Sequence, residues 1–209
     1  MGFYPVFLDM NQRRCAVVGG GAVAARKVEG LLAAGADVTV IGPAVSEGLR
    51  ELLTAGAVGH VAREYRSGDL AGYDLVFVAT DDAAVNAAVC RDARAQDVWV
   101  NSADDPDHCD FILPAVIRRG DLIVAVSTGG ASPAATRAIR EELEGYFTAE
   151  YSQLVQVAAA VRRELREKSF SVGAGAWNDA LKGEFRRLIR AGQPEQAKEF
   201  LLTTLGARS

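Results

Sequence analysis

The segment CAVVGGGAVAARKVEGLLAAGADVTVI, residues 15–41, decides the fold of this chain. It opens with a short β-branched run that breaks into glycines, after which Val28, Leu31 and Leu32 recur at helical spacing. A second β-branched run, DVTVI, follows at residues 37–41. Strand, glycine turn, helix and strand in this order predict the first unit of a parallel sheet with crossover helices.

The same alternation continues to about residue 100. A helix is predicted from about Ser46 and a weaker strand near residues 58–61. The apolar run LVFVA at residues 75–79 is typical of a strand that is buried on both faces. A further helix and a strand at residues 98–100 follow it. Five strands with helical crossovers predict an α/β fold, a Rossmann-like doubly wound parallel sheet.

After Asn101 the pattern changes. The apolar runs at residues 111–117 and 122–126 are joined by four residues, which suffice for an antiparallel β-hairpin but not for a crossover helix. Ser132 and Pro133 then suit the N-cap and first position of a helix. From about residue 148 the pattern is wholly helical, with SVGAGAW at residues 171–177 as the candidate interhelical loop. The expected parts are residues 1–110, a Rossmann-like domain; 111–147, a hairpin and helix; and 148–209, a small helical C-terminal domain.

Composition narrows the class of protein. The net charge of −4 and the pI of about 5.3 argue against a general nucleic-acid or anionic-membrane surface. The scattered cysteines Cys15, Cys90 and Cys109 form no C-x-x-C pair, which suggests reduced thiols. We find no basic leader and no run near the ~18 apolar residues of a membrane span, so a soluble, cytoplasmic protein is expected. Two widely separated histidines give no reason to expect a metal site.

Gly19, Gly21 and Ala24 fit the pattern G-x-G-x-x-G/A between the first strand and the first helix. Small residues there let a pyrophosphate approach backbone N–H groups at a helix N-terminus, so the pattern predicts dinucleotide binding. The alternative is a tight turn that binds nothing. The acidic residue that commonly follows the second strand is replaced by Ile41-Gly42-Pro43, so the residues do not separate NAD from NADP.

Two pairs of carboxylates follow predicted strands. Asp81 and Asp82 come after the fourth strand, and Asp104 and Asp105 come after the fifth. Open α/β sheets bind ligands outside the carboxyl ends of their strands, so these side chains are candidates for proton transfer. The alternatives are helix capping for the first pair and turn formation for the second.

A local basic cluster stands out in this acidic chain. Arg118 and Arg119 lie in the hairpin connection, and Arg137 and Arg140 lie i, i+3 on the following helix. Such a cluster is suited to binding carboxylates. The alternative is a solvated helix face on which the arginines pair with Glu141 and Glu144, two acidic residues of the same helix.

Four segments together resemble the precorrin-2 dehydrogenase family, the siroheme synthase N-terminal type. They are GGGAVAARKVEGLLAAGADVTVIGP at residues 19–43, ATDDAAVN at 79–86, VNSADDPDHCDFILPAVIRRG at 100–120 and VSTGGASPAATRAIREELE at 126–144. The resemblance covers about residues 3–150. Its most specific parts are N-x-x-DDP…C-x-F-x-x-P and ST-x-G-x-SP, which generic dinucleotide-binding folds lack.

The resemblance implies NAD-dependent oxidation of precorrin-2 to sirohydrochlorin, and in some members also insertion of Fe²⁺, which stays open for this chain. It implies a homodimer, with residues 111–147 serving dimerisation and the active site. Asp104 matches the family's active-site aspartate, and Thr128 occupies the serine or threonine position of its pocket loop. Arg137 and Arg140 are expected to bind the tetrapyrrole substrate. The expected NAD-binding residues are Gly19, Gly21, Ala22, Val23, Pro43, Ala44 and Thr80.

Two other functions compete with this interpretation. A non-catalytic NAD-sensing Rossmann module explains residues 15–100 equally well but not the basic hairpin and the acidic proline loop that follow. An oxidoreductase acting on a small alcohol or hydroxy acid would need a His or Tyr-x-x-x-Lys proton relay. The chain contains no Tyr-x-x-x-Lys sequence.

Overall fold

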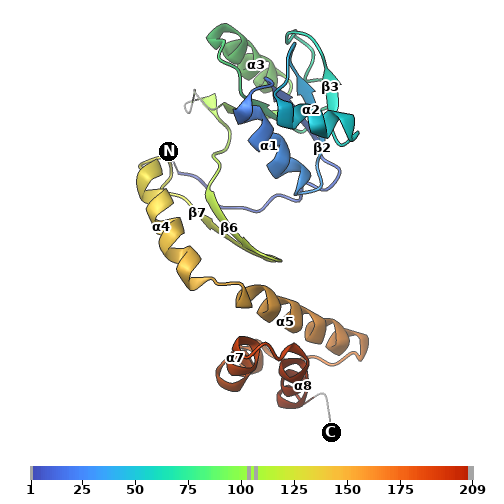
Figure 1. Cartoon of the computed structure of the whole chain (residues 1–209), viewed down its shortest axis with the longest axis vertical. Helices are drawn as coiled ribbons and strands as arrows, with labels where there is room; N and C mark the ends of the chain where they lie inside the picture. Colours follow the sequence, from blue (N-terminus) through green and yellow to red (C-terminus); the bar gives the residue numbers. More distant parts are fainter. Residues whose placement is uncertain (1, 103–104, 106–107, 207–209) are drawn as a thin grey trace. The chain divides into compact units, whose positions relative to one another are not determined.

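Figure 1 shows the computed structural model of the chain, which describes residues 2–102, 105 and 108–206. The chain forms two compact units, which divide between Ile112 and Leu113. The first is built around a parallel sheet, and the second combines a β-hairpin with helices.

The first unit contains a five-stranded parallel sheet with strand order β3-β2-β1-β4-β5. This order confirms the predicted doubly wound sheet, with β1 at its centre. The elements are β1 (Arg14–Val18), α1 (Ala22–Leu32), β2 (Asp37–Ile41), α2 (Glu47–Thr54), β3 (Gly59–Val61), β4 (Leu75–Val78), α3 (Ala83–Ala95) and β5 (Trp99–Ser102).

Helices cover both faces of this sheet, and alternation along each strand divides its side chains between them. Cys15 and Val17 of β1 share a buried cluster with residues of α1 and α2. Their neighbours Ala16 and Val18 belong to a second cluster, which includes α3. The central strands are therefore buried on both faces, as continuous apolar runs predict.

One crossover differs from the prediction. The connection between β3 and β4, residues 62–74, contains turns and no helix. Arg63 closes it by donating from Nη1 and Nη2 to the carboxylate of Asp69, at 2.7 and 2.8 Å. Leu70 is fully buried and fixes the loop to the α3 side of the sheet. Side-chain pairing and one apolar residue replace the crossover helix.

The second unit opens with an antiparallel hairpin, as predicted. The strand begins at Ala115 rather than Phe111, because Pro114 lacks an N–H and the Phe111 ring packs on Phe77 of the first unit's core, with centroids 5.6 Å apart. The elements are β6 (Ala115–Arg119), β7 (Leu122–Val126), α4 (Pro133–Tyr146), α5 (Glu150–Glu167), α6 (Ala174–Ala180), α7 (Gly183–Arg190) and α8 (Pro194–Thr204).

The core of the second unit lies between α5, α7 and α8. Val161, Phe185 and Leu201, one from each helix, have no exposed surface. The predicted interhelical loop is shorter than expected, because α6 begins at Ala174 behind its N-cap Gly173. Helix α4 stands apart from this core, since none of its residues is buried.

Candidate functional site

The glycine turn that follows β1 lies at the point where the strand order of the sheet reverses. Strand β1 pairs with β2 on one side and with β4 on the other. The carboxyl ends of parallel strands meet at one edge, and ligands of such sheets bind in the crevice at this switch point. Residues 19–21 and residues 79–82 therefore flank the same crevice.

The first two glycines of the turn are required by the backbone around them. Gly19 has a φ of +115°, and a Cβ there would overlap the carbonyl oxygen of Ala79. A Cβ at Gly20 would overlap the carbonyl oxygen of Ala44, and the Gly20 carbonyl accepts a hydrogen bond from Ser46 N at 2.7 Å. Gly20 was not among the predicted site residues, although its place in the Gly-Gly-Gly run could have indicated it.

The third glycine faces open space. Gly21 is the N-cap of α1 and supplies no capping side chain, and no atom of the described residues would lie within 4 Å of a Cβ at this position. Among the described residues, nothing accepts a hydrogen bond from the N–H groups of Ala22 and Val23 in the first turn of α1. Two unpaired N–H groups at the positive end of a helix form a site for an anion.

Ala24, the last residue of the motif, is fully buried against the sheet. Its small side chain lets α1 lie close to β1, so that the helix N-terminus points into the crevice. The turn thus has the small residues, the helix end and the open space that a dinucleotide pyrophosphate requires. The residues present fit NAD.

The loop after β2 forms a second wall of this crevice. Gly42 donates its N–H to Val61 O at 3.1 Å, and its carbonyl lies 2.9 Å from Nε2 of His60. His60, which sequence reasoning left without a role, therefore holds this loop in place. Pro43 and Ala44, both predicted to contact NAD, are exposed there.

Thr80 is held in the loop after β4 by a side chain from α3. Its Oγ1 lies 2.5 Å from Oδ1 of Asn86, and Nδ2 of Asn86 donates to the Thr80 carbonyl at 3.0 Å. Asn86 ends the segment ATDDAAVN and had no predicted role. It fixes the backbone of a residue that is expected to contact the cofactor.

The carboxylates after β4 and β5 separate into different roles. Asp82 is the N-cap of α3, where Oδ1 accepts from Ala84 N at 2.8 Å and Val85 N at 3.1 Å. The carboxylate of Asp105 is engaged by Nδ1 of His108 at 2.6 Å. Asp81 is exposed. Asp104, the predicted catalytic residue, lies outside the described residues.

A cluster of hydrogen-bonded polar groups lies at the carboxyl end of β5. Nδ2 of Asn101 donates to the Phe111 carbonyl at 2.9 Å, and Sγ of Cys109 accepts from Ser102 N at 3.1 Å. The Cys109 thiol also lies 3.3 Å from the carbonyl oxygens of Ser102 and Asp105. Burial raises the pKa of Cys109, so the thiol stays neutral and serves as a hydrogen-bonding group. The cluster anchors both ends of the acidic loop.

Lys27 is a cation that sequence reasoning overlooked. Its Nζ lies 5.1 Å from the centroid of the Phe77 ring, and burial, reinforced by Arg26, lowers the pKa of its ammonium. Among the described residues no carboxylate forms an ion pair with it. A half-buried cation of this kind is suited to an anionic group brought by a ligand.

The predicted substrate-binding residues belong to the second unit. Oγ1 of Thr128 accepts from Ser132 N at 3.0 Å and lies 2.9 Å from Oγ1 of Thr136, so it organises its own loop. Arg140 pairs with Glu141 at 3.2 Å and with Glu144 at 2.7 Å, as the structural alternative expected. Arg137 forms no ion pair within the described part of the chain and keeps its charge available. Arg119 is committed to the Phe147 carbonyl at 2.7 Å.

Two kinds of feature are absent from the described residues. Residues 2–102, 105 and 108–206 contain no helix long and apolar enough to cross a membrane. They also contain no group of three or more His, Cys, Asp or Glu side chains arranged to hold a metal ion.

Comparison with known families gives two matches in consecutive parts of the chain. Residues 6–115 match the family described as "Putative NAD(P)-binding", and residues 119–146 match "Sirohaem biosynthesis protein central". The first covers the sheet and the glycine turn, in agreement with the predicted use of NAD. The second covers the hairpin and α4.

Individual proteins extend the likeness to nearly the whole chain. Siroheme synthases from Photobacterium profundum and Nitrosomonas eutropha are 40% and 41% identical, over 97% and 98% of this chain. The chain spans 44% of the length of each of these relatives. The solved structure of SirC, precorrin-2 dehydrogenase, is 31% identical with a TM-score of 0.77, and the match covers 97% of this chain and 98% of that one. These matches agree with the resemblance predicted from the four motif segments.

Proposed function

Because the chain belongs to the family of precorrin-2 dehydrogenases and siroheme synthases, we propose that it oxidises precorrin-2 to sirohydrochlorin with NAD as the hydride acceptor. The observation that carries this proposal is the glycine turn at the switch point of the sheet. Its N–H groups at Ala22 and Val23 have no acceptor among the described residues, and the space beside Gly21 is open. A full-length structural relative with dehydrogenase activity supports the same reaction.

The reaction removes one hydride and one proton from the macrocycle as its conjugation extends. NAD, when bound, takes up the hydride at its nicotinamide ring. The residues of the chain must hold the dinucleotide, orient the tetrapyrrole and accept the proton. The glycine turn with Ala22 and Val23 holds the pyrophosphate, and the Asn86-supported loop at Thr80 flanks the same crevice.

We propose that Asp104 accepts the proton that leaves the macrocycle. In the sequence Asp104 follows β5, and β5 ends at the sheet edge where the glycine turn lies. The neighbouring Asp105 is less suited, because its carboxylate already accepts a hydrogen bond from His108. Replacing Asp104 with Ala should slow precorrin-2 oxidation by about 10² to 10⁴ and leave NAD affinity nearly intact. A folded Asp104→Ala protein that oxidises precorrin-2 at close to the normal rate would remove this assignment.

The acetate and propionate groups of the substrate need cationic partners. Arg137 is the first candidate, since it has no carboxylate partner in the described structure, and Lys27 is a second cation without one. Arg140 and Thr128 remain proposed substrate contacts, although both are engaged within the chain. Charge reversal at Arg137 should therefore weaken precorrin-2 binding more than charge reversal at Arg140 does, and neither change should affect NAD affinity.

Three finer proposals accompany the reaction. The chain is proposed to act as a homodimer, which is supported by α4, an amphipathic helix without a buried residue, and by exposed Leu113, Val116 and Ile139. Fe²⁺ is proposed as a second substrate, to be inserted into sirohydrochlorin. The expected cytoplasmic location stays a prediction.

Anaerobic incubation with precorrin-2 and NAD tests the proposed reaction. Sirohydrochlorin and NADH should appear together in a 1:1 ratio, each followed by its absorbance. NAD binding without turnover of precorrin-2 would favour the NAD-sensing alternative. Addition of Fe²⁺ to the product mixture tests iron insertion separately, through the absorbance of siroheme.

A further inference from the structure

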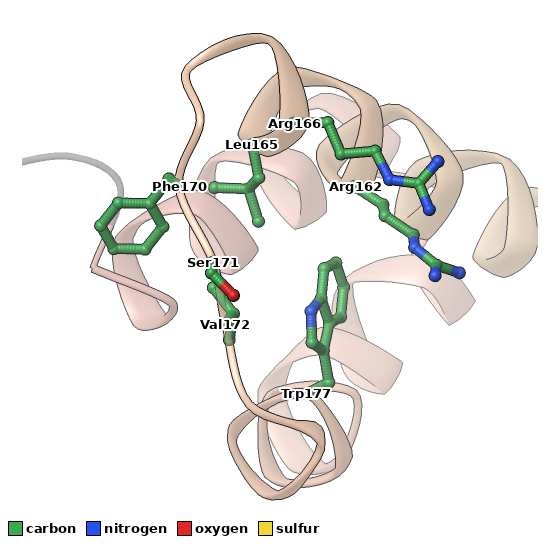
Figure 2. Close-up of a pocket in the computed structure, with 7 residues that line it drawn as sticks. All are labelled: Arg162, Leu165, Arg166, Phe170, Ser171, Val172 and Trp177. Atoms are coloured by element: carbon green, nitrogen blue, oxygen red, sulfur yellow. The ribbon is translucent and has the colours of Figure 1, made fainter.

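The second unit contains a cavity that the proposed reaction does not use. Its volume is about 200 Å³, and Figure 2 shows it between α5, the segment 170–172 and α6. The lining residues are Arg162, Leu165, Arg166, Phe170, Ser171, Val172 and Trp177. All of them lie within the second compact unit.

One part of the cavity wall is apolar and contains a large flat surface. Leu165 projects from α5 beside Val172, and the indole ring of Trp177 forms the opposite side (Figure 2). Leu165 belongs to the core between the helices, and Trp177 packs against this core, so both side chains are held in place. A rigid indole facing branched aliphatic side chains suits a planar ring.

The polar side chains that line the cavity are all able to donate hydrogen bonds. The guanidinium groups of Arg162 and Arg166, four residues apart on α5, extend to the same side of the cavity (Figure 2). The Ser171 hydroxyl and the Trp177 indole N–H complete the set. Among the described residues that line the cavity there is no carboxylate. Such a set of donors recognises an anion.

The two arginines also differ from the cations around them. Lys168 and Lys198 both pair with Glu164, at 2.9 and 3.1 Å, and Arg190 pairs with Glu150 at 3.4 Å. Within the described residues neither Arg162 nor Arg166 forms an ion pair. The positive charge of these two arginines is thus left for a ligand.

We propose that this cavity binds a small aromatic carboxylate. Its ring would lie between Trp177 and the aliphatic wall, and its carboxylate would face Arg162 and Arg166, whose planar guanidinium groups match carboxylate geometry. The volume fits a single ring rather than a drug-sized molecule. The apolar wall, together with the two guanidinium groups, favours this ligand over a bare inorganic anion.

Fluorescence of Trp177 tests the proposal with sodium benzoate as the probe. The chain has two tryptophans, so the full-length Trp99→Phe protein isolates the signal of Trp177. Benzoate should change this fluorescence saturably. Benzamide, which keeps the ring but lacks the charge, and acetate and phosphate at matched ionic strength, which lack the ring, should each bind at least about tenfold more weakly.

Variants locate the site. Arg162→Gln and Arg166→Gln should each weaken benzoate binding about tenfold, whereas Arg163→Gln, on the same helix but outside the cavity lining, should not. Benzoate should also raise the unfolding temperature of the Trp99→Phe protein, a readout that needs no arginine variant. Absence of saturation up to about 10 mM, equal binding of benzamide or phosphate, or equal loss in Arg163→Gln would overturn the proposal.

Discussion

The turn at residues 19–21 and the loop at residues 127–133 both lead from a strand into a helix, and both contain adjacent glycines. They differ in what their polar groups bind. In the second loop, Ser132 caps α4 by accepting from Ala135 N at 3.2 Å, and Pro133 has no N–H to satisfy. In the first, Gly21 offers no side chain and the first N–H groups of α1 lack an acceptor among the described residues.

The difference shows how one local pattern serves two purposes. A helix N-terminus that is capped by its own side chains is a structural feature, whereas one left uncapped at the edge of a parallel sheet is available to a ligand phosphate. The strands also differ, since β1 is buried on both faces over Cys15–Val18 and β7 is only partly buried. A rigid, uncapped helix end is what a cofactor site requires.

The largest expected effect is the cost of a side chain inside the first turn. Gly19→Ala should lower the free energy of unfolding by about 3 kcal/mol or more, because its φ is +115° and the Cβ meets the Ala79 carbonyl. Gly21→Ala is the matched control and should cost about 0.5 kcal/mol, since its Cβ meets no atom of the described residues. Denaturant unfolding measures both. Equal losses in the two variants would contradict the described geometry of the turn.

A negative charge at Gly21 should weaken NAD binding without lowering the free energy of unfolding. Gly21→Asp places a carboxylate at the N-cap of α1, where aspartate is a favourable cap, so the free energy of unfolding should hold or rise slightly. NAD affinity should fall about 100-fold or more, because the carboxylate occupies the phosphate position. Calorimetric titration checks this, and unchanged affinity in the folded variant would mean that the cofactor binds elsewhere.

Removing the N-cap in the second loop should lower stability without changing NAD affinity, the opposite of the result expected for Gly21→Asp. Ser132→Ala deletes the acceptor for Ala135 N and should cost about 1 kcal/mol of unfolding free energy. NAD affinity should stay the same, because this helix end is proposed to hold no phosphate. A loss of NAD affinity comparable to that of Gly21→Asp would remove the distinction between the two loops.

The last expected effect appears only at alkaline pH and concerns the buried strand that supports the first turn. Burial, together with Asp74 and Asp37, raises the pKa of Cys15 to about 11, above its ordinary value of about 8.5. The folded state favours the neutral thiol. Its contribution to the free energy of unfolding is therefore fully present below about pH 8.5 and declines between about pH 8.5 and about pH 11. In this range the free energy of unfolding should fall by roughly 1 kcal/mol per pH unit. Cys15→Ala should flatten this part of the stability profile.

The sequence predicted those features of the fold that depend on local periodicity and turn chemistry. The parallel sheet, the hairpin and the Ser132 cap follow from residue spacing and from side chains that act on their own helix. The β3–β4 crossover was predicted wrongly, because the Arg63–Asp69 pair and buried Leu70 stabilise a turn that periodicity does not reveal. The late start of β6 likewise depends on tertiary packing of Phe111.

The candidate site was predicted in outline but not in its supports. The motif located Gly19 and Gly21, yet His60 and Asn86 act through backbone carbonyls of distant loops, which no sequence spacing encodes. Lys27 had no predicted role, because its contact with Phe77 depends on tertiary packing that residue spacing does not reveal. Assignment of Asp104 to proton transfer rests on its position in the family motif and stays a prediction.

Backbone amide NMR during a titration with NAD tests the central claim most directly. The amide resonances of Ala22 and Val23 should shift strongly and gain protection from hydrogen exchange, while that of Ala135 should stay in place. Shifts at Ala135 without shifts at Ala22 and Val23 would contradict the claim that the uncapped end of α1 receives the cofactor phosphates.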